Sequence, residues 1–408
     1  MTAPSARRPS APGPLEMGTL EMGAGERAAE RLRIGILCHP TYGGSGVVAS
    51  ELALTLAGRG HTVHLFSHAV PPRLARSSGP VEMHVAQGFP YPLFHSTPHD
   101  LAITSSILQI HRGEGLDVLH AHYALPHAVS AYLARSAAIA DGGRAAPRIV
   151  TTLHGTDITL VGNDPSYAPL TQFVIEQSDA VTAVSENLAR RTRENFCRAP
   201  LHGCAIEVIP NGVDTELFHP SRGEGRASDT PSVVHVSNFR PVKRVPWLVE
   251  AFARATRDLP SRLTLVGDGP EQPAARERAR AQGILDRVTF LGERDALAEV
   301  LATADVFALS SSDESFGLSA LEAMSSGTAV VATDVGGVGE VVEAGVTGLL
   351  SPAEDLDAFA GNLRGLLEDR GRARSLGLAG RRRAEEHFAR DTIALRYEGL
   401  YRRLLGVL

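Results

Sequence analysis

The sequence predicts an α/β protein of two doubly wound domains, each a parallel sheet covered by helices, that face each other across a cleft. Three observations support this prediction. The chain has 408 residues, which is more than one hydrophobic core usually accommodates. From Arg33 onward, short apolar runs alternate with segments of helical periodicity, as in βαβ units. A polar stretch at 218–231 interrupts this alternation, which then starts again.

The first half of the chain begins with a βαβ pattern. The run RIGILC at 33–38 is expected to form a strand, and apolar positions then recur at helical spacing over 47–60. Gly60 stands where a helix needs its C-terminal cap. A second strand, TVHLF, follows at once. The other strands expected in this half are 117–122, 148–155, 180–185 and 205–212, with a helix at 126–140.

The second half repeats the pattern. Its expected strands, with helical segments between them, are 232–239, 262–269, 287–292, 305–310, 329–334 and 348–350. A last helix over 391–408 has apolar positions three and four residues apart. The start of the chain is rich in Pro, Ala, Gly and Ser and cannot bury a core. We therefore expect a disordered tail 1–31, an N-terminal domain 32–212 completed by the helix 391–408, and a C-terminal domain 213–390.

The bulk composition disfavours several classes of function. A net charge of −6 offers no basic surface for nucleic acid. No stretch approaches the roughly 18 apolar residues of a membrane span, and residues 1–30 lack the apolar centre of a signal peptide. The cysteines are odd in number and irregularly spaced, so we expect reduced thiols at Cys38, Cys197 and Cys204. We expect a cytoplasmic protein that binds small molecules and does not insert into membranes.

The segment 310–327, SSSDESFGLSALEAMSSG, is the most informative for function. Glu314 follows an expected strand, and a helix is expected to open near Phe316 or Gly317. The free N–H groups and positive dipole end of such a helix suit a phosphate. Glu322, eight positions after Glu314, would accept hydrogen bonds from sugar hydroxyls. An isolated pair of glutamates would be read more simply as a helix-start acid and a solvated residue, but the surrounding motifs favour a binding site.

Those motifs resemble a known family. The glutamate pair, the string EAMSSG, the run AVVATDVGG and the motif GVTGLL together resemble the retaining glycosyltransferases of the GT-B fold, which has two Rossmann-like domains. The resemblance extends over nearly all of 33–408. It implies that Glu314 contacts the donor sugar, that Glu322 holds the nucleotide ribose and that Lys243 lies on the donor diphosphate. A cation there would stabilise the charge of the departing diphosphate without a metal.

The donor side departs from the family pattern at one position. Members usually carry an arginine five residues before the lysine, and this sequence has Asn238 there, so that Arg240 or Arg244 would supply the charge. The glycines of the loop 267–271 either line the nucleotide site or only turn the chain, and Arg294 is near the base by family position. The donor-binding residues expected are Asn238, Arg240, Gly267, Gly269, Arg294, Phe316, Gly317, Leu318 and Glu322.

The acceptor side is expected on the first domain. The loop 39–46, HPTYGGSG, precedes a helix, and its amides and hydroxyl suit an anion. It lacks the spacing G-x-G-x-x-G, which disfavours a dehydrogenase. Arg73 would bind a carboxylate in two hydrogen bonds or be an ordinary surface residue, and Gln172 stands where the resemblance predicts an arginine. The acceptor-binding residues expected are Gly44, Ser45, Arg73, Tyr123, Thr151 and Thr152.

The remaining expectations concern catalysis and metals. His154, which follows an expected strand in TTLHGTD, lies beside the reacting sugar if the resemblance holds. The catalytic residues expected are His154, Lys243 and Glu314. Three histidines of HAHYALPHA also invite a metal-site interpretation: His120, His122 and His127. No carboxylate or cysteine near them would complete such a site, so we expect neither a metal nor a cofactor.

The local strings narrow the expected substrates. CHPTYGGSG, AHYALPHAV, TTLHGTDIT and ESFGL further resemble the bacillithiol-pathway glycosyltransferases of this family. This resemblance implies UDP-N-acetylglucosamine as donor, L-malate as acceptor, and front-face attack with retention of anomeric configuration. Two alternatives stay open: a transferase with another acceptor, such as an inositol phosphate or a polysaccharide, and a UDP-N-acetylglucosamine epimerase. Whether the chain forms a homo-oligomer is also left open.

Overall fold

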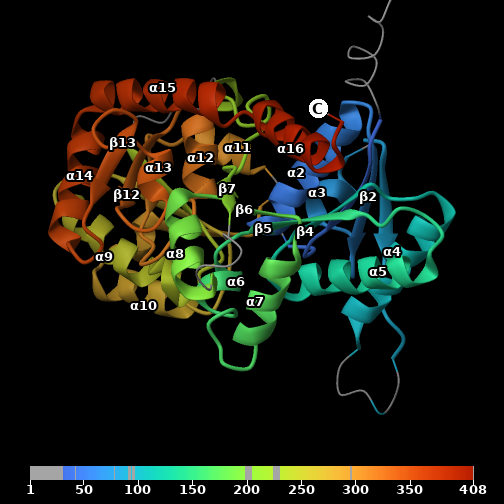
Figure 1. Cartoon of the computed structure of the whole chain (residues 1–408). Coiled ribbons are helices and arrows are strands. Elements are labelled where there is room, and N and C mark those ends of the chain that lie inside the picture. The colour runs from blue at the N-terminus through green and yellow to red at the C-terminus, as the bar shows by residue number, and fades with distance from the viewer. Residues whose placement is uncertain are drawn as a thin grey trace, which may run out of the picture.

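The computed structural model of the chain has two α/β domains side by side (Figure 1). The residues that it describes are 31–407 without 42, 78, 91–92, 94–96, 198–204, 224–229 and 295. The tail predicted at 1–31 therefore lies outside the described residues except for Arg31. Both domains are parallel sheets with helices on both faces, so the fold class predicted from the sequence is confirmed.

The first sheet has seven strands in the order β3-β2-β1-β4-β5-β6-β7, all parallel. Its strands are β1 (Arg33–Leu37), β2 (Thr62–Ser67), β3 (Val81–Val85), β4 (Val118–His122), β5 (Arg148–Leu153), β6 (Ala180–Ala183) and β7 (Ile206–Val208). The interior strand β1 is apolar on both faces, as a strand covered by helices on both sides must be.

The helices of this domain divide between the two faces of the sheet. They are α2 (Ser45–Gly58), α3 (Pro72–Ala75), α4 (His99–Gly113), a π-helical turn (Ala124–Ala128), α5 (Val129–Asp141), α6 (Thr156–Thr159), α7 (Ala168–Gln177) and α8 (Glu186–Phe196). Ile34 and Ile36 pack with α2, whereas Leu37 packs with α4 and α5. Successive side chains of a strand point to opposite faces, so β1 joins two separate hydrophobic clusters.

The outermost strand, β3, was not among the strands expected from the sequence. Of its five residues, VEMHV, three are partly buried and two are exposed. Such a short edge strand has no continuous apolar run, and none of its side chains is fully buried. The periodicity signal is therefore weak, and only pairing with β2 defines the strand.

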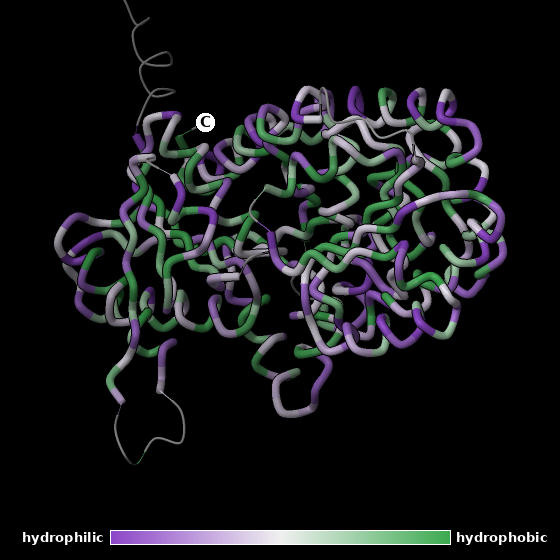
Figure 2. Tube along the Cα trace, turned by 180° about the vertical axis from the view of Figure 1, so that it is seen from behind, coloured by the Kyte–Doolittle hydropathy of each residue, from purple (hydrophilic) through white to green (hydrophobic). Residues whose placement is uncertain are grey.

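The second sheet has six parallel strands in the order β10-β9-β8-β11-β12-β13. They are β8 (Ser232–Val236), β9 (Arg262–Val266), β10 (Val288–Gly292), β11 (Val306–Leu309), β12 (Ala329–Thr333) and β13 (Gly348–Ser351). The remaining helices are α9 (Val245–Ala255), α10 (Gln272–Ala281), α11 (Leu297–Ala302), α12 (Leu318–Ser325), α13 (Val338–Val341), α14 (Leu356–Glu368) and α15 (Arg370–His387) of this domain and the last helix, α16 (Arg390–Leu405), with 3-10 turns at Pro220–Gly223, Pro241–Lys243 and Leu285–Arg287. Hydrophobic residues concentrate along the strands inside both domains (Figure 2).

The chain crosses between the domains at two adjacent places. The Val213 N–H donates to the Phe388 carbonyl at 2.8 Å, and the Arg390 N–H donates to the Val213 carbonyl at 3.0 Å. After this crossing α16 packs on α2 of the first domain, where Tyr397 and Tyr401 are buried in its core (Figure 1). The last helix therefore packs with the first domain. The chain between the two crossings forms the second domain.

The structure bears on the expectations about membrane spans and about the cysteines. None of the described helices has the length and the apolar composition of a membrane span. Cys38 is a free and fully buried thiol, and burial raises its pKa to about 12. Cys197, by contrast, is disulfide-bonded. The expectation of reduced thiols is therefore wrong at Cys197, because the spacing of cysteines along a sequence does not reveal which of them meet in space.

Candidate active site

Two of the expected catalytic residues form an ion pair at the carboxyl edge of the second sheet. Lys243 ends the 3-10 turn after β8, and Glu314 lies in the loop between β11 and α12. Because β8 and β11 are adjacent parallel strands, their following loops meet. The Lys243 Nζ lies 2.5 Å from the Glu314 Oε2, which also accepts from the Ser311 hydroxyl at 3.2 Å. Both side chains keep some exposure, 20% and 16%, so a ligand can reach them.

The expected nucleotide-loop glycines have a structural reason of their own. Gly267 has φ 115° and Gly269 has φ 155°. A Cβ would lie 1.8 Å from the Ser237 carbonyl oxygen at Gly267 and 2.1 Å from the Asn238 carbonyl oxygen at Gly269. The two glycines therefore let the loop after β9 press against the loop after β8. The sequence left open whether these glycines line the nucleotide site or only turn the chain. Close packing of the two loops is enough to explain them without a ligand.

Arg240 and Arg244, the two candidates to replace the arginine missing at Asn238, have different surroundings in the structure. Arg244 donates to the Ser310 and Ala353 carbonyls at 2.8 and 2.7 Å, and its guanidinium stacks on Trp247. These contacts fix Arg244 inside the domain and remove it as a substitute for the missing arginine. Arg240 is exposed, as is Asn238. Arg294 is also exposed, beyond the edge strand β10.

The start of α12 adds donors and a carboxylate to the same edge. The helix begins at Leu318 with Gly317 in the left-handed conformation, close to the start expected from the sequence. Phe316 is buried against Phe388 of the domain crossing. Glu322 is buried on α12, and burial raises its pKa to about 7, with Arg73 acting in the opposite direction. None of the described residues donates a hydrogen bond to its carboxylate, which leaves both oxygens available for hydroxyl groups.

His154 lies opposite, in the loop after β5 of the first domain. Its Nε2 is 3.0 Å from the His122 Nδ1, and its ring stacks on Tyr123 with centroids 5.6 Å apart. Burial lowers the pKa of His154 to about 3, so the imidazole is neutral near pH 7. Asp157, three residues further along the chain, accepts the N–H groups of His154, Gly155 and Ala124. It therefore holds the loops after β4 and β5 together.

The two domains touch beside these residues. A Cβ on Gly155 would lie 1.6 Å from the Ser315 Oγ, and the Ser185 hydroxyl donates to the Ser315 carbonyl at 2.7 Å. The Glu340 carboxylate of α13 accepts the first N–H groups of α8 across the same boundary. The sequence analysis missed this contact. The only signal for it is that Gly155 and Ser315 directly follow two expected catalytic residues, His154 and Glu314.

Part of the expected acceptor site is assembled at this boundary. Ser45 starts α2 after Gly44, and the side chains of Ser45 and Thr156 lie close enough to the Tyr123 hydroxyl to lower its pKa. Tyr123 has φ 102°, a strained conformation that costs about 1–3 kcal/mol and is common at functional sites. Burial raises the pKa of Tyr123, and the nearby positive charge of Arg240, from the second domain, acts in the opposite direction.

Three expected acceptor residues have partners within the protein. Arg73 pairs with Glu51 at 2.9 Å, stacks on Phe218 and lies near enough to Glu322 to lower the pKa of that carboxyl. Thr151 and Thr152 are fully buried: the Thr151 hydroxyl bonds to Ser178, and the Thr152 hydroxyl bonds to partners inside the core. These placements argue against direct acceptor contacts by the two threonines, because their hydroxyls are enclosed and already paired.

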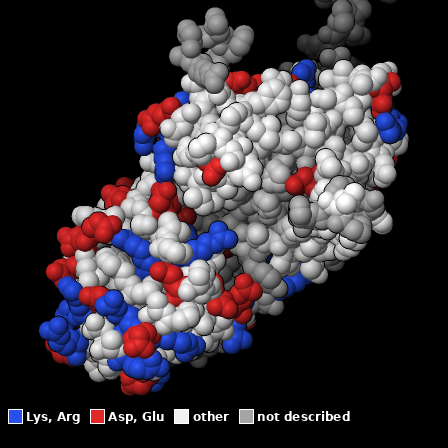
Figure 3. All heavy atoms as spheres, turned by 90° about the horizontal axis from the view of Figure 1, so that it is seen from below, with Lys and Arg blue, Asp and Glu red and all other residues white. Residues whose placement is uncertain are grey.

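The charges of the two domains differ on the face shown in Figure 3. Basic and acidic side chains crowd the C-terminal domain, whereas the N-terminal domain is mostly uncharged there, and a hollow separates the two. The expected phosphate contacts thus belong to the more highly charged domain.

Acidification is expected to destabilise the fold because several histidines are buried in the neutral form. Burial lowers the pKa of His120 and His154 to about 3 and that of His235 to about 4; it also lowers the pKa of His122 and His127. An unfolded histidine titrates near pH 6.5. Below that pH the unfolded state binds more protons, so each histidine removes up to about 1.4 kcal/mol of stability per pH unit.

Two carboxyls oppose this trend, because burial raises the pKa of Asp157 to about 6 and that of Glu322 to about 7. Protonation of these two groups on acidification stabilises the folded state. They are outnumbered by the five histidines. The urea concentration at the midpoint of unfolding should therefore decrease when the pH is lowered from about 7.5 to about 5. The exposed-histidine variant His387→Gln should keep the full dependence, and His120→Gln should show a shallower one. An equal midpoint at both pH values would contradict the prediction.

Comparison with known proteins identifies the family. Residues 230–369 match the model of the glycosyl transferases group 1, and residues 42–217 match that of glycosyltransferase family 4. The chain is 40% identical to N-acetyl-alpha-D-glucosaminyl L-malate synthase of Bacillus anthracis, over 91% of this chain and 97% of that protein. It is 32% identical to D-inositol 3-phosphate glycosyltransferase of Nocardia farcinica, over 88% and 83%.

A solved structure agrees with this result. Sucrose-phosphate synthase from Thermosynechococcus elongatus superposes with a TM-score of 0.74 at 25% identity, over 93% of this chain and 100% of that chain. The fold, the paired lysine and glutamate, and the likeness over about nine tenths of the chain are consistent with one another. The chain belongs to the group 1 glycosyltransferases of the GT-B fold.

Proposed function

We propose that this glycosyltransferase moves N-acetylglucosamine from UDP-N-acetylglucosamine to the hydroxyl of L-malate, with retention of anomeric configuration. The products are N-acetyl-alpha-D-glucosaminyl L-malate and UDP, and the reaction is the first step of bacillithiol biosynthesis in the cytoplasm. The observation that carries the proposal is the likeness, along nearly the whole chain, to a synthase of that product.

The donor binds mainly to the second domain in this proposal. Lys243 neutralises the diphosphate, and the N–H groups at the start of α12 bind the phosphate oxygens. Glu322, whose carboxylate oxygens are not used inside the protein, accepts the ribose hydroxyls. Glu314 and the neutral imidazole of His154 hold the sugar from opposite domains. Supporting this division, Lys243 and Glu314 are 2.5 Å apart at one sheet edge, and Ser315 meets Gly155 across the boundary.

The acceptor binds at the start of α2. L-Malate carries two carboxylates, which need hydrogen-bond donors and a cation. The Ser45 and Tyr123 hydroxyls lie near each other there, and the charge of Arg240, from the other domain, acts on Tyr123. Arg240 was expected on the donor diphosphate, and in this proposal it binds the acceptor instead. An arginine binds a carboxylate through two parallel hydrogen bonds. Because the cation and the hydroxyls come from different domains, the acceptor site is complete only when the domains are close together.

The proposed chemistry is a direct front-face substitution. The bond between the sugar C1 and the phosphate oxygen breaks, a bond forms between C1 and the malate hydroxyl oxygen, and the hydroxyl proton passes to the departing phosphate. Lys243 stabilises the charge that grows on the diphosphate, and the two domains exclude water from the reacting bond. This route uses no metal and no cofactor.

The test is an acceptor panel with UDP-N-acetylglucosamine, following UDP release and product mass. L-Malate should be glycosylated fastest. Similarity to D-inositol 3-phosphate glycosyltransferases makes inositol phosphate the competitor to include, with a polysaccharide acceptor as a further arm. UDP release with inositol phosphate alone would overturn the malate assignment, and conversion of the donor without any acceptor would indicate an epimerase.

A further inference from the structure

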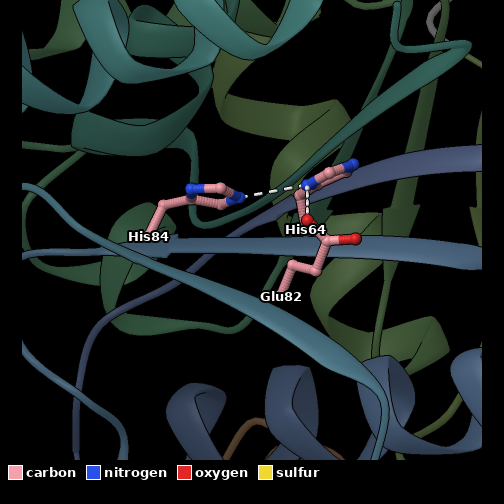
Figure 4. A group of neighbouring side chains, drawn as sticks. All are labelled: His64, Glu82 and His84. Atoms are coloured by element: carbon pink, nitrogen blue, oxygen red, sulfur yellow. Dashed lines mark hydrogen bonds and ion pairs between the residues drawn. The ribbon is translucent and has the colours of Figure 1, made fainter. Parts of the chain in front are cut away.

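Two histidines and a glutamate meet at the outer edge of the first sheet, far from the candidate active site. His64 lies on β2, and Glu82 and His84 lie on the edge strand β3. The register pairs His64 with Glu82 and Phe66 with His84, so the three side chains share one face of the sheet. Figure 4 shows the His84 ring and the Glu82 carboxylate both pointing toward His64.

The distances among their ligand atoms suit a small tetrahedral cation. The His64 Nδ1 is 3.0 Å from the His84 Nε2 and 3.5 Å from the Glu82 Oε2, and the three residues offer one atom each within 4.8 Å of the others. Zinc bonds of about 2.0–2.2 Å separate tetrahedral ligands by about 3.3–3.6 Å. The Glu82 side chain is 55% exposed, so it can adjust its position, and an ion can enter from solvent beside it.

The surroundings of His64 supply the support that metal-binding histidines usually have. Its ring is fully buried, and its Nε2 has no hydrogen-bond partner among the described residues. That nitrogen lies 3.8 Å from the Glu114 Oε2, at the C-terminal end of α4. When one histidine nitrogen binds a metal, the other carries a proton and commonly faces a carboxylate. Nδ1 and Nε2 of His64 are oriented for these two roles.

We propose that His64, Glu82 and His84 bind one Zn²⁺ ion that fastens the edge strand β3 to β2. Two imidazole nitrogens and one carboxylate oxygen are ligands that zinc accepts, whereas calcium and magnesium prefer oxygen alone. The site is structural: β2 separates β3 from β1, the strand that leads into the acceptor loop 39–46. The sequence predicted no metal, but that prediction concerned His120, His122 and His127. It did not include Glu82 and His84, because strand β3 was not expected.

The experiment uses the full chain without an affinity tag, treated with a chelator and dialysed before titration with ZnCl₂. Calorimetry should give one ion per chain, and the melting temperature should rise with Zn²⁺ because the ion binds only the folded site. Cobalt in place of zinc should give the visible absorption of a four-coordinate ion. No binding at one equivalent would show that the 3.0 Å contact is only a hydrogen bond between imidazoles, and would overturn the proposal.

Variants locate the ion. His84→Ala and Glu82→Ala change partly exposed side chains on an edge strand and should each weaken Zn²⁺ binding by about 100-fold or more, whereas Glu114→Gln should weaken it by about 10-fold with unchanged stoichiometry. The matched control is His387→Gln, which removes an exposed histidine that lies beside a carboxylate without a second histidine; its affinity should not change. Binding that survives both His84→Ala and Glu82→Ala would place the ion elsewhere and contradict the proposal.

Discussion

Replacing Lys243 with alanine should lower kcat by about 100- to 1,000-fold, the usual cost of removing one group that stabilises charge in a transition state. The Lys243 ammonium lies 2.5 Å from the Glu314 carboxylate. In the proposed reaction the negatively charged diphosphate of the leaving UDP lies against this ammonium. The measurement is steady-state turnover with UDP-N-acetylglucosamine and L-malate at saturating concentrations, together with circular dichroism and a thermal melt.

The control separates charge from structure. Lys243→Arg retains a cation on the same turn and should retain more activity than Lys243→Ala, while Arg374→Ala removes an exposed arginine on α15, outside the candidate site, and should leave kcat unchanged. A large change in the melt of Lys243→Ala would show a structural role. A rise in donor KM at constant kcat would show that Lys243 binds the ground state and the transition state equally, which contradicts the proposed role.

The fold could be predicted far enough to place the chemistry. Apolar runs alternating with helical segments predicted every strand of the second sheet, because each of those strands carries a short apolar run and the inner ones are largely buried. The edge strand β3 escaped because its residues are half exposed. The start of α12 was predicted from its glycine within one or two residues. The packing of α16 on α2 needs a contact across the whole chain, which periodicity alone does not specify.

The candidate site shows the same limit at the level of residues. Lys243 and Glu314 follow adjacent strands, and the resemblance named both, but no local pattern shows that they touch. Thr151 and Thr152 were both expected to bind the acceptor, although neighbouring residues of a strand face opposite sides of the sheet. The structure resolves this: one hydroxyl faces Ser178 and the other faces His120 and Thr182.

The contact between domains is the part of the site that the sequence analysis missed, and Gly155→Ala tests it. With φ 121° at Gly155 and a Cβ that would lie 1.6 Å from the Ser315 Oγ, alanine must push the His154 loop away from Glu314 or hold the domains apart. A displacement of about 1 Å at reacting groups costs about 100-fold in rate, so kcat should fall by about that factor. Turnover is measured together with the radius of gyration from small-angle scattering.

A second substitution distinguishes the clash between domains from backbone strain. Both the Ser315 Oγ and its Cβ, 2.6 Å from the added methyl position, obstruct that methyl, so Ser315→Gly in the Gly155→Ala background should recover part of the lost rate. Strain at positive φ would remain in the double variant. Gly142→Ala is the matched control, because Gly142 has φ 65° with nothing within 4 Å of an added Cβ: it introduces strain alone and should lower stability without lowering kcat. If Gly155→Ala also kept full turnover, the contact at Ser315 would have no part in assembling the site. Recovery in the double variant would instead show that catalysis depends on how closely His154 of one domain can approach Glu314 of the other.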